Sequence, residues 1–595
     1  MKLRYKIYKE KVYGCFTGKS VGGTLGMPFE GQLDVDSVTY YDPVPTEMVP
    51  NDDLDLQVVN LETLLRTGFP VSRHHIGEIW LHHMEDNAPD EYSVGIANHK
   101  LGIRGPLSGQ YRNKFHSGMG AAIRSELWAC VAPANPKLAA LLAREDACTD
   151  HTGDGIYTEM FLAAVESQAF IENDLEKLIQ TGLEFVDKES KLYKVFGDVI
   201  RLYKETKDVY AVKEYILRQY PCDNWTDVTI NVSFILLALI ASDGDFDKAI
   251  CTATSLGYDA DCTAATVGAI FGIMKPDSID EKWTNPIGDA LVLSPCIVNM
   301  HSFDTISEFC EVVMSVANYA QEYYQTGIQF EGADGFADIR LADSWTDDYK
   351  SLYDWKIGAK ESLLTGLPCL MSLVYPEEVA AEPGKSKEYT LKLCADKDIS
   401  GSVKLFVPEK WQVSSETFSF NLSKGETKEI SFFVKPDAEQ GLRCQKNILT
   451  MRFCINGVTF VQEAGLPVST PWMVTAADGR EYVYEATSIY FPVPSGEYRY
   501  KTRVNSPIQK NVRMACNGTR PFIVKLNGET VYEGDGSFYV PAFHRGDTWT
   551  NVVLNTGASN EIEVVFPEYK EGEFFFGFGT TFGCATWLDT IERTL

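Results

Sequence analysis

The chain has 595 residues, which is more than a single hydrophobic core usually serves, so several domains are expected. Hydrophobic residues make up 45% and charged residues 23%, as in ordinary globular proteins. Acidic residues outnumber basic ones by 83 to 54, and the formal net charge is −29. Because such a surface repels phosphate backbones and anionic lipids, nucleic acids and membranes are not expected partners.

The N-terminal segment MKLRYKIYKEKVYGC is basic and lacks the apolar core of a signal peptide, and no stretch reaches the length of a membrane span. We therefore expect a cytoplasmic protein, unless a signal peptide has been removed from the chain. The cysteines include no C-x-x-C pair. Reduced, mostly buried thiols are predicted rather than a zinc ribbon or a disulfide framework.

Residues 1–330 show the apolar spacing of helices. Leu54, Val58, Leu61 and Leu65 recur at helical intervals. Similar patterns run through residues 137–144, 155–170, 228–241 and 263–274. Because continuous β-type alternation is absent here, we predict an all-α domain over residues 1–330.

Residues 331–370 are rich in Asp, Trp and Tyr, and we expect them to form a connector packed on the helical domain. After Pro376 the chain changes to short β-rich runs separated by Gly, Pro, Asp and Ser. Runs at 389–393, 403–407 and 430–434 predict an immunoglobulin-like sandwich over residues 371–470. A second set begins near Ala476 and predicts a jelly-roll or carbohydrate-binding-like sandwich over residues 475–595. The expected fold is therefore multidomain, one all-α domain followed by two all-β sandwiches.

Two acidic motifs each open a predicted helix. Asn51-Asp52-Asp53-Leu54-Asp55 follows Pro50, and Asp259-Ala260-Asp261 precedes a helix lined with small residues. Acidic residues at helix starts are common as caps and dipole partners. Closely spaced carboxylates nevertheless repel one another unless a cation screens them. Oxygen ligands without paired His or Cys favour Mg²⁺ or Ca²⁺ over Zn²⁺.

Several motifs occur in the order typical of one family. They are Gly14-x3-Gly18 through Gly26-Met27-Pro28-Phe29-Glu30, Asn51-Asp52-Asp53, Gly120-Ala121-Ala122-Ile123-Arg124, and Asp259-Ala260-Asp261 with the small-residue run 263–272. In this set the chain, over about residues 10–320, resembles the ADP-ribosylglycohydrolase family. The resemblance implies an all-α fold, a centre of one or two Mg²⁺ ions and cleavage of a glycosidic bond at the anomeric carbon of a ribose.

Carried over by position, the resemblance implies metal ligands and catalytic groups. The implied metal ligands are Asn51, Asp52, Asp53, Asp259 and Asp261. The implied catalytic residues are Glu30, Asp53 and His151, of which His151 is equally explained as a hydrogen-bonded loop or helix-cap histidine. Water would attack an oxocarbenium-like centre, and Glu30 or Asp53 would accept its proton or stabilise the cation.

The expected substrate is a small molecule or glycan that contains a ribose-like sugar, with ADP-ribosyl conjugates implied by the family. Two alternatives stay open. One is a glycosidase for carbohydrates or nucleosides on the same scaffold, and the other is a non-catalytic binding protein with a decayed metal site.

Two positions depart from the family pattern. Asn51 stands where the family usually has Thr or Ser, and its amide can donate a hard oxygen or cap the helix. Cys262 stands where the family usually has Thr, and a thiol is a poor partner for Mg²⁺. We therefore expect Cys262 to pack as a small apolar residue outside the coordination shell, leaving one ion weakly held or absent.

Overall fold

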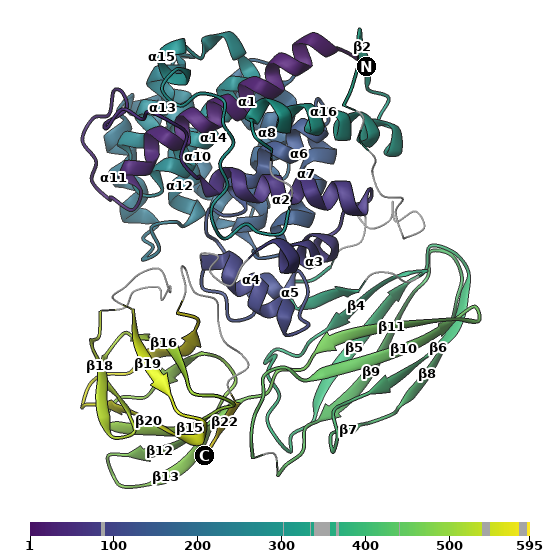
Figure 1. Ribbon diagram of the computed structural model, residues 1–595, viewed down its shortest axis with the longest axis vertical. Coiled ribbons are helices and arrows are strands. Elements are labelled where there is room, and N and C mark those ends of the chain that lie inside the picture. Colours follow the sequence, from purple (N-terminus) through teal and green to yellow (C-terminus); the bar gives the residue numbers. More distant parts are fainter. Residues whose placement is uncertain are drawn as a thin grey trace. The chain divides into compact units, whose positions relative to one another are not determined.

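The computed structural model describes the chain except residues 85–89, 301–302, 334, 338, 340–356, 365–367, 440, 538–547 and 582–591. The chain forms two compact units. The helical unit comprises Met1–His83 and Phe115–Ser344, and the β unit comprises Met84–Lys114 and Trp345–Leu595. Helices followed by β-sheets confirm the predicted multidomain fold class (Figure 1). None of the helices in the described ranges combines the length and the apolar character that crossing a bilayer requires.

The helical unit is built around α1 (Tyr5–Gly26) and α14 (Ala260–Met274), which lie side by side (Figure 1). Small residues allow this approach. A Cβ atom added at Gly18 would lie 2.1 Å from the carbonyl oxygen of Gly268, and one added at Gly22 would lie 2.0 Å from that of Ala264. Glycine therefore lets the two backbones touch. The pairing brings the end of α1 to the start of α14, where Asp261 lies.

The other helices of this unit surround the pair. The longer ones are α2 (Asp52–Thr67), α3 (Arg73–His83), α6 (Ser125–Val131), α7 (Pro136–Ala147), α8 (Asp154–Ala169), α9 (Leu175–Leu183), α10 (Lys191–Thr206), α11 (Val209–Gln219), α12 (Val228–Ala241), α13 (Phe246–Ser255) and α16 (Ile306–Tyr323). One short parallel strand pair, β1 (Lys2–Arg4) with β2 (Gln329–Glu331), joins the two ends of the unit. The core helices α12 and α14 are almost entirely buried, as their lack of charged residues beyond Asp261 predicts.

A segment of the predicted helical domain belongs to the β unit instead. It contains α4 (Asp90–Lys100) and α5 (Leu107–Gln110). Four of its apolar side chains lie in the core of the first sandwich: Leu101, Ile103, Leu107 and Tyr111. The backbone also joins the sheets, because the Gly465 N–H donates to the Gly102 oxygen at 2.9 Å. The compact units therefore do not coincide with the predicted boundary near residue 330.

The first sandwich has two sheets around one core. One sheet has the order β3 (Glu361–Leu364), β4 (Leu370–Val374), β5 (Lys387–Cys394), β9 (Thr427–Lys435) and β7 (Gln412–Val413). The other has the order β11 (Val458–Gly465), β10 (Ile448–Ile455), β6 (Ile399–Phe406) and β8 (Thr417–Leu422). Alternate residues of β9 are buried, as expected for a strand with one face on a core. Of the predicted connector, residues 361–364 form β3, while 340–356 and 365–367 lie outside the described residues.

The second sandwich has its own aromatic core. One sheet has the order β13 (Glu481–Ala486), β12 (Thr470–Ala476), β15 (Tyr498–Ser506), β20 (Gly557–Phe566), β17 (Pro521–Leu526) and β18 (Glu529–Asp535), with β22 (Glu592–Thr594) also paired to β15. The other has the order β14 (Tyr490–Val493), β21 (Gly572–Gly579), β16 (Lys510–Gly518) and β19 (Trp549–Leu554). Trp472 and Phe576 meet edge to face at 5.5 Å within this core. The immunoglobulin-like and jelly-roll assignments stay predictions.

Candidate metal centre

The first acidic motif is organised by the start of α2. Asn51 is the N-cap of this helix, and its side-chain oxygen accepts a hydrogen bond from the Asp53 N–H at 2.8 Å. The structure thus shows Asn51 in the capping role, one of the two roles that the sequence allows. Asp55 turns away from the motif, since its carboxylate accepts from the Ser294 N–H at 2.9 Å. Asp52 and Asp53 remain at the helix start.

The second acidic motif is organised by the start of α14. Tyr258 has a φ of 63°, a left-handed conformation that turns the chain sharply before the helix. The Asp259 N–H donates to the Asn231 side-chain oxygen on α12 at 3.1 Å, which fixes the turn. Asp261 and Cys262 follow in the first helical turn.

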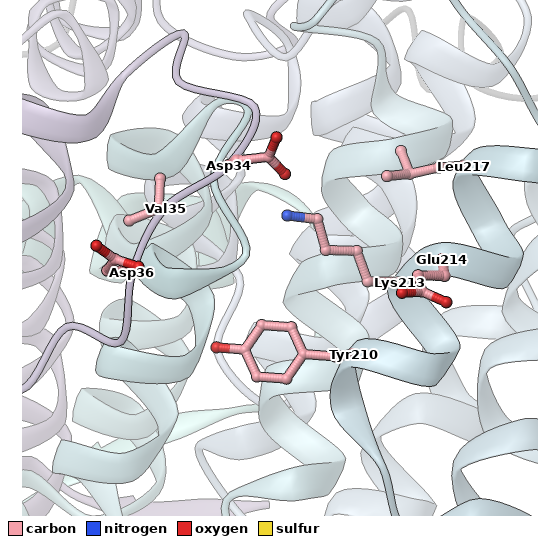
Figure 2. Close-up of a pocket in the computed structure, with 7 residues that line it drawn as sticks. All are labelled: Asp34, Val35, Asp36, Tyr210, Lys213, Glu214 and Leu217. Carbon is pink, nitrogen blue, oxygen red and sulfur yellow. The ribbon is translucent and has the colours of Figure 1, made fainter.

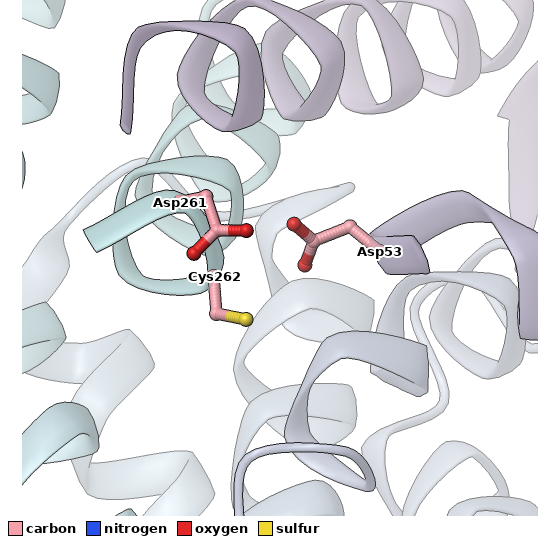
Figure 3. A group of neighbouring side chains, drawn as sticks. All are labelled: Asp53, Asp261 and Cys262. Carbon is pink, nitrogen blue, oxygen red and sulfur yellow. The ribbon is translucent and has the colours of Figure 1, made fainter. Parts of the chain in front are cut away.

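Three side chains from the two motifs converge, and we call them the metal triad: Asp53, Asp261 and Cys262. One ligand atom of each lies within 4.8 Å of the other two. Figure 3 shows the Asp53 and Asp261 carboxylates facing each other with the Cys262 sulfur beside them. The sequence predicts that the Cys262 side chain packs away from the site. The structure instead directs its sulfur toward the two carboxylates, so its expected orientation is wrong.

The triad carboxylates are buried without full compensation. Asp53 is 1% exposed and Asp261 is 4% exposed. Asp53 Oδ2 and Asp261 Oδ1 find no hydrogen-bond partner among the described residues. Burying a polar group without a hydrogen-bond partner costs about 1–3 kcal/mol, and a charged carboxylate costs more. These residues therefore fit a bound cation, which would satisfy both oxygens.

The charges around the triad also favour a bound cation. Burial raises the pKa of Asp261 well above its usual value, and the charges of Glu30 and Asp259 raise it further. Burial and neighbouring carboxylates raise the pKa of Asp52 and of Asp259 in the same direction. We call these carboxylates the acidic cluster: Glu30, Asp52, Asp53, Asp259 and Asp261. A divalent cation would relieve their mutual repulsion.

A buried lysine lies behind the cluster. Lys19 of α1 is fully buried, and its Nζ lies 2.9 Å from Glu126 Oε1 and 3.5 Å from Asp53 Oδ1. Burial by itself lowers the pKa of Lys19, but the charges of Glu126 and Asp53 outweigh it and raise the pKa. Gln57 donates to the other Glu126 oxygen at 2.9 Å. Lys19 thus stays charged and orients Asp53, but the same ammonium group also pairs with Glu126.

Glu30 lies on the open side of this arrangement. It follows the short 3₁₀ helix η1 (Met27–Phe29) at the end of α1 and is exposed. Its loop is joined to the α14 turn, because the Gly31 N–H donates to the Tyr258 oxygen and the Tyr258 N–H donates to the Gln32 oxygen, both at 2.8 Å. The structure therefore places an exposed carboxylate near buried ones, an arrangement suited to acid–base chemistry beside a metal.

The loop that follows Glu30 borders, at residues 34–36, a pocket of about 300 Å³ (Figure 2). Its lining comes from the loop and from α11: Asp34, Val35, Asp36, Tyr210, Lys213, Glu214 and Leu217. Lys213 Nζ donates to the Leu33 oxygen at 3.0 Å. The lysine thus fastens the loop to α11, and the Tyr258 bonds fasten it to α14.

Comparison with known proteins assigns the chain to a family. The model of the ADP-ribosylglycohydrolase family matches residues 4–322, which is more than half of the chain and includes every member of the acidic cluster. The chain belongs to the ADP-ribosylglycohydrolase family. An uncharacterized protein of Archaeoglobus fulgidus is 24% identical to it over 298 residues, which cover 47% of this chain and 92% of that protein.

Two solved structures are also similar. One, an ADP-ribosylglycohydrolase-related protein complex, has 17% identity and a TM-score of 0.38, and covers 53% of this chain and 99% of its own. The other, an anti-sigma factor domain-containing protein from Clostridium clariflavum, has 8% identity and a TM-score of 0.17, and covers 35% of this chain and 84% of its own.

His151 lies in a different environment from the acidic cluster of this ADP-ribosylglycohydrolase family member. It is fully buried, its Nδ1 lies 2.7 Å from Asp150 Oδ1, and its Nε2 accepts from the Ala121 N–H at 3.3 Å. Asp150 is itself held by two nitrogens of Arg124, at 2.9 and 3.1 Å. Both ring nitrogens are therefore engaged, as the alternative of a hydrogen-bonded loop histidine predicts. Its catalytic role stays a prediction.

Sequence reasoning misses Lys19, Glu126 and the orientation of Cys262. Lys19 lies in Gly14-Cys15-Phe16-Thr17-Gly18-Lys19-Ser20, which resembles a phosphate-binding loop with one residue too few between its glycines. A lysine inside a run of small and apolar residues is the signal that could have found it. Such a lysine is buried with the rest of the helix and needs a carboxylate partner.

Proposed function

We propose that this ADP-ribosylglycohydrolase family member is a metal-dependent hydrolase that cleaves a ribosyl glycosidic bond of the ADP-ribosyl type. The observation that supports this most is the pair of unpartnered, buried carboxylate oxygens on Asp53 and Asp261. Four further features agree with it: the raised pKa values, Lys19 behind the cluster, Glu30 in front of it, and the family match.

The buried aspartates of the acidic cluster suit the role of metal ligands. Asp53 and Asp261 would hold the cation, with Asp52 and Asp259 beside them. Their oxygens are ligands that suit Mg²⁺. When bound, the cation would bind the vicinal hydroxyls of the sugar and offset charge changes at the anomeric carbon.

Glu30 suits the role of general base better than Asp53 does. It is exposed, so substrate and water can reach it, whereas Asp53 is 1% exposed and faces Lys19. Glu30 would take the proton of the attacking water as the bond to the leaving group breaks. Burial raises the pKa of Asp53, and Lys19 and Asn51 oppose that rise without cancelling it, so a bound cation would keep Asp53 ionised as a ligand.

The test is a panel of substrates assayed with chelator-treated protein before and after Mg²⁺ is added. The panel contains ADP-ribosylated protein, free ADP-ribosyl conjugates, nucleosides and aryl glycosides. Release of ADP-ribose that depends on the metal would support the proposal. Turnover of nucleosides or aryl glycosides alone would favour the glycosidase alternative, and absence of both metal binding and turnover would favour the binding protein with a decayed metal site.

Glu30→Gln tests the assigned base, with Glu10→Gln as its control. Glu10 is also an exposed glutamate, on the opposite end of α1. Glu30→Gln should lower kcat about 10²-fold or more and leave metal binding in place, as loss of a general base usually does. The control should keep full activity. Equal activity of the two variants would exclude Glu30 as the base.

A further inference from the structure

The metal triad contains one ligand atom that Mg²⁺ does not favour. The Cys262 sulfur lies within 4.8 Å of ligand oxygens of Asp53 and Asp261, and the side chain is 7% exposed. The sulfur therefore lies close to both carboxylates.

The helix geometry explains why the sulfur reaches the site. Asp261 and Cys262 are consecutive in the first turn of α14, and although successive side chains of a helix lie roughly 100° apart around its axis, both come within 4.8 Å of Asp53. Asp53 approaches from the start of α2, opposite both of them (Figure 3). A cation that contacts both carboxylates is thus presented with the sulfur as a third ligand.

The chemistry of this donor set differs from that of an all-oxygen site. Mg²⁺ is a hard ion that takes oxygen ligands in near-ideal octahedral geometry. Thiolate ligands favour softer ions such as Zn²⁺, and carboxylates with one thiolate also suit Fe²⁺ and Co²⁺. The two unpartnered carboxylate oxygens supply the independent evidence that a cation belongs here.

We propose that the metal triad binds a first-row transition ion that accepts sulfur, of the class of Fe²⁺, Co²⁺ and Zn²⁺, more tightly than it binds Mg²⁺. Binding forms a bond between the Cys262 sulfur and the ion, and the thiol proton passes to the solvent. The inference rests on the proposed function only in treating the acidic cluster as a metal site.

The experiment uses the full chain after treatment with chelator, and the probes are Co²⁺, Zn²⁺ and Mg²⁺. Co²⁺ bound to a thiolate shows a charge-transfer band in the near ultraviolet, which reports sulfur coordination directly. Titration calorimetry then measures the affinities for Zn²⁺ and Mg²⁺. Both measurements are repeated on Cys262→Thr, which replaces the sulfur with a hard oxygen. The control is Cys310→Ala, because Cys310 is fully buried on α16 and its sulfur lies 3.9 Å from the Val12 oxygen.

The unaltered protein and Cys310→Ala should show the cobalt–thiolate band, and Cys262→Thr should lack it. The preference for Zn²⁺ over Mg²⁺ should fall by about tenfold or more in Cys262→Thr, the size of change usual when a metal site is altered. A Co²⁺ complex of the unaltered protein without the band, or tighter binding of Mg²⁺ than of Zn²⁺, would overturn the proposal.

The outcomes separate this inference from the proposed function. A cobalt–thiolate band in a protein that cleaves no substrate supports the inference and contradicts the hydrolase proposal. Mg²⁺-dependent cleavage without the band supports the hydrolase proposal and contradicts the inference. If none of the three ions binds, and Asp261→Asn changes nothing, both the inference and the metal-dependent function fail.

Discussion

The helical unit contains two groups of buried aspartates that differ in how their charge is balanced. The first is the acidic cluster at the starts of α2 and α14. The second, which we call the Arg124 network, consists of Arg124, Asp146, Asp150 and His151. In the network, Arg124 donates to both aspartates, and Asp146 also accepts from Asn60 and Trp128. In the acidic cluster, Asp53 Oδ2 and Asp261 Oδ1 have no hydrogen-bond partner among the described residues, whereas the network oxygen that also lacks one, Asp146 Oδ1, lies 3.1 Å from Arg124 Nε.

The pKa values of Asp150 and Asp261 differ in the same way, although burial still raises the pKa of Asp146 despite the charge of Arg124. Burial alone raises the pKa of Asp150, but the charge of Arg124 outweighs it and the pKa falls to about 2. Burial raises the pKa of Asp261, and its carboxylate neighbours raise it further. Removing the guanidinium partner of a buried aspartate destabilises the fold, whereas a buried aspartate surrounded by like charges is stabilised when a cation binds beside it. The two groups should therefore respond oppositely to mutation, metal and pH.

The largest effect is expected from removing the positive charge of the network. Arg124→Met leaves Asp146 and Asp150 buried without their guanidinium and should lower the free energy of unfolding by about 3–5 kcal/mol. Urea denaturation measures this. Arg201→Met is the control, because the ion pairs of Arg201 lie on the surface and its loss should leave the free energy of unfolding almost unchanged. If Arg124→Met does not fold, Arg124→Lys should show a smaller loss. No loss in either variant would contradict the structural role.

Mutation of the acidic cluster should affect activity and spare the fold. Asp261→Asn keeps the shape of the side chain but removes one charge from an anionic group. It should lower kcat/KM about 10²- to 10³-fold, since a metal ion contributes several kcal/mol to transition-state stabilisation. The unfolding free energy of the metal-free protein should not fall. A marked loss of stability in this variant, measured by urea denaturation without metal, would place Asp261 among the structural residues.

Metal should stabilise the protein through the acidic cluster alone. A divalent cation at about 100 times its Kd should raise the free energy of unfolding by about 2.7 kcal/mol. Chelator should reverse the effect. The shift in Tm should persist in Asp150→Asn and disappear in Asp261→Asn. A shift that survives in Asp261→Asn would mean that the ion binds elsewhere.

The smallest effect concerns acid stability of the Arg124 network. The folded pKa of Asp150 is about 2, below the usual unfolded value of about 3.9, so its contribution is present above pH 4 and lost as pH falls toward 2. The difference corresponds to about 2.6 kcal/mol. Urea denaturation at pH 5 and pH 3 should show a steeper loss for the unaltered protein than for Asp150→Asn. Parallel losses would show that Asp150 has no depressed pKa.

Part of the site follows from local sequence. Asp53 and Asp261 are recognisable because acidic residues cluster at two helix starts, and Glu30 because its segment resembles the family's first motif. The Gly14, Gly18, Gly22 and Gly26 spacing repeats every four residues, and the structure shows its effect, because these glycines let α1 touch α14. The orientation of Cys262 could not be predicted, since it depends on how α14 is rotated against α1 and α2.

Local sequence patterns also do not predict that Met84–Lys114 belongs to the β unit. The segment contains the helix α4 and lies within the residues that match the family. Its apolar residues Leu101, Ile103, Leu107 and Tyr111 are nevertheless buried with β-strands more than 250 residues away in sequence. Hydrophobic periodicity shows that a face must be buried, but it does not show which partner buries it.

The sequence by itself thus determines the helical and β halves, the two acidic helix starts and the excess of negative charge. These are properties of neighbouring residues, set by the periods of helix and strand and by the chemistry of carboxylates. Only the tertiary structure decides that Lys19 and Glu126 lie behind Asp53, that Arg124 binds the Asp150 carboxylate, and that the Cys262 sulfur lies close to Asp53. The physical reason is that these contacts join residues far apart in the chain, and packing of whole helices determines which of their side chains meet.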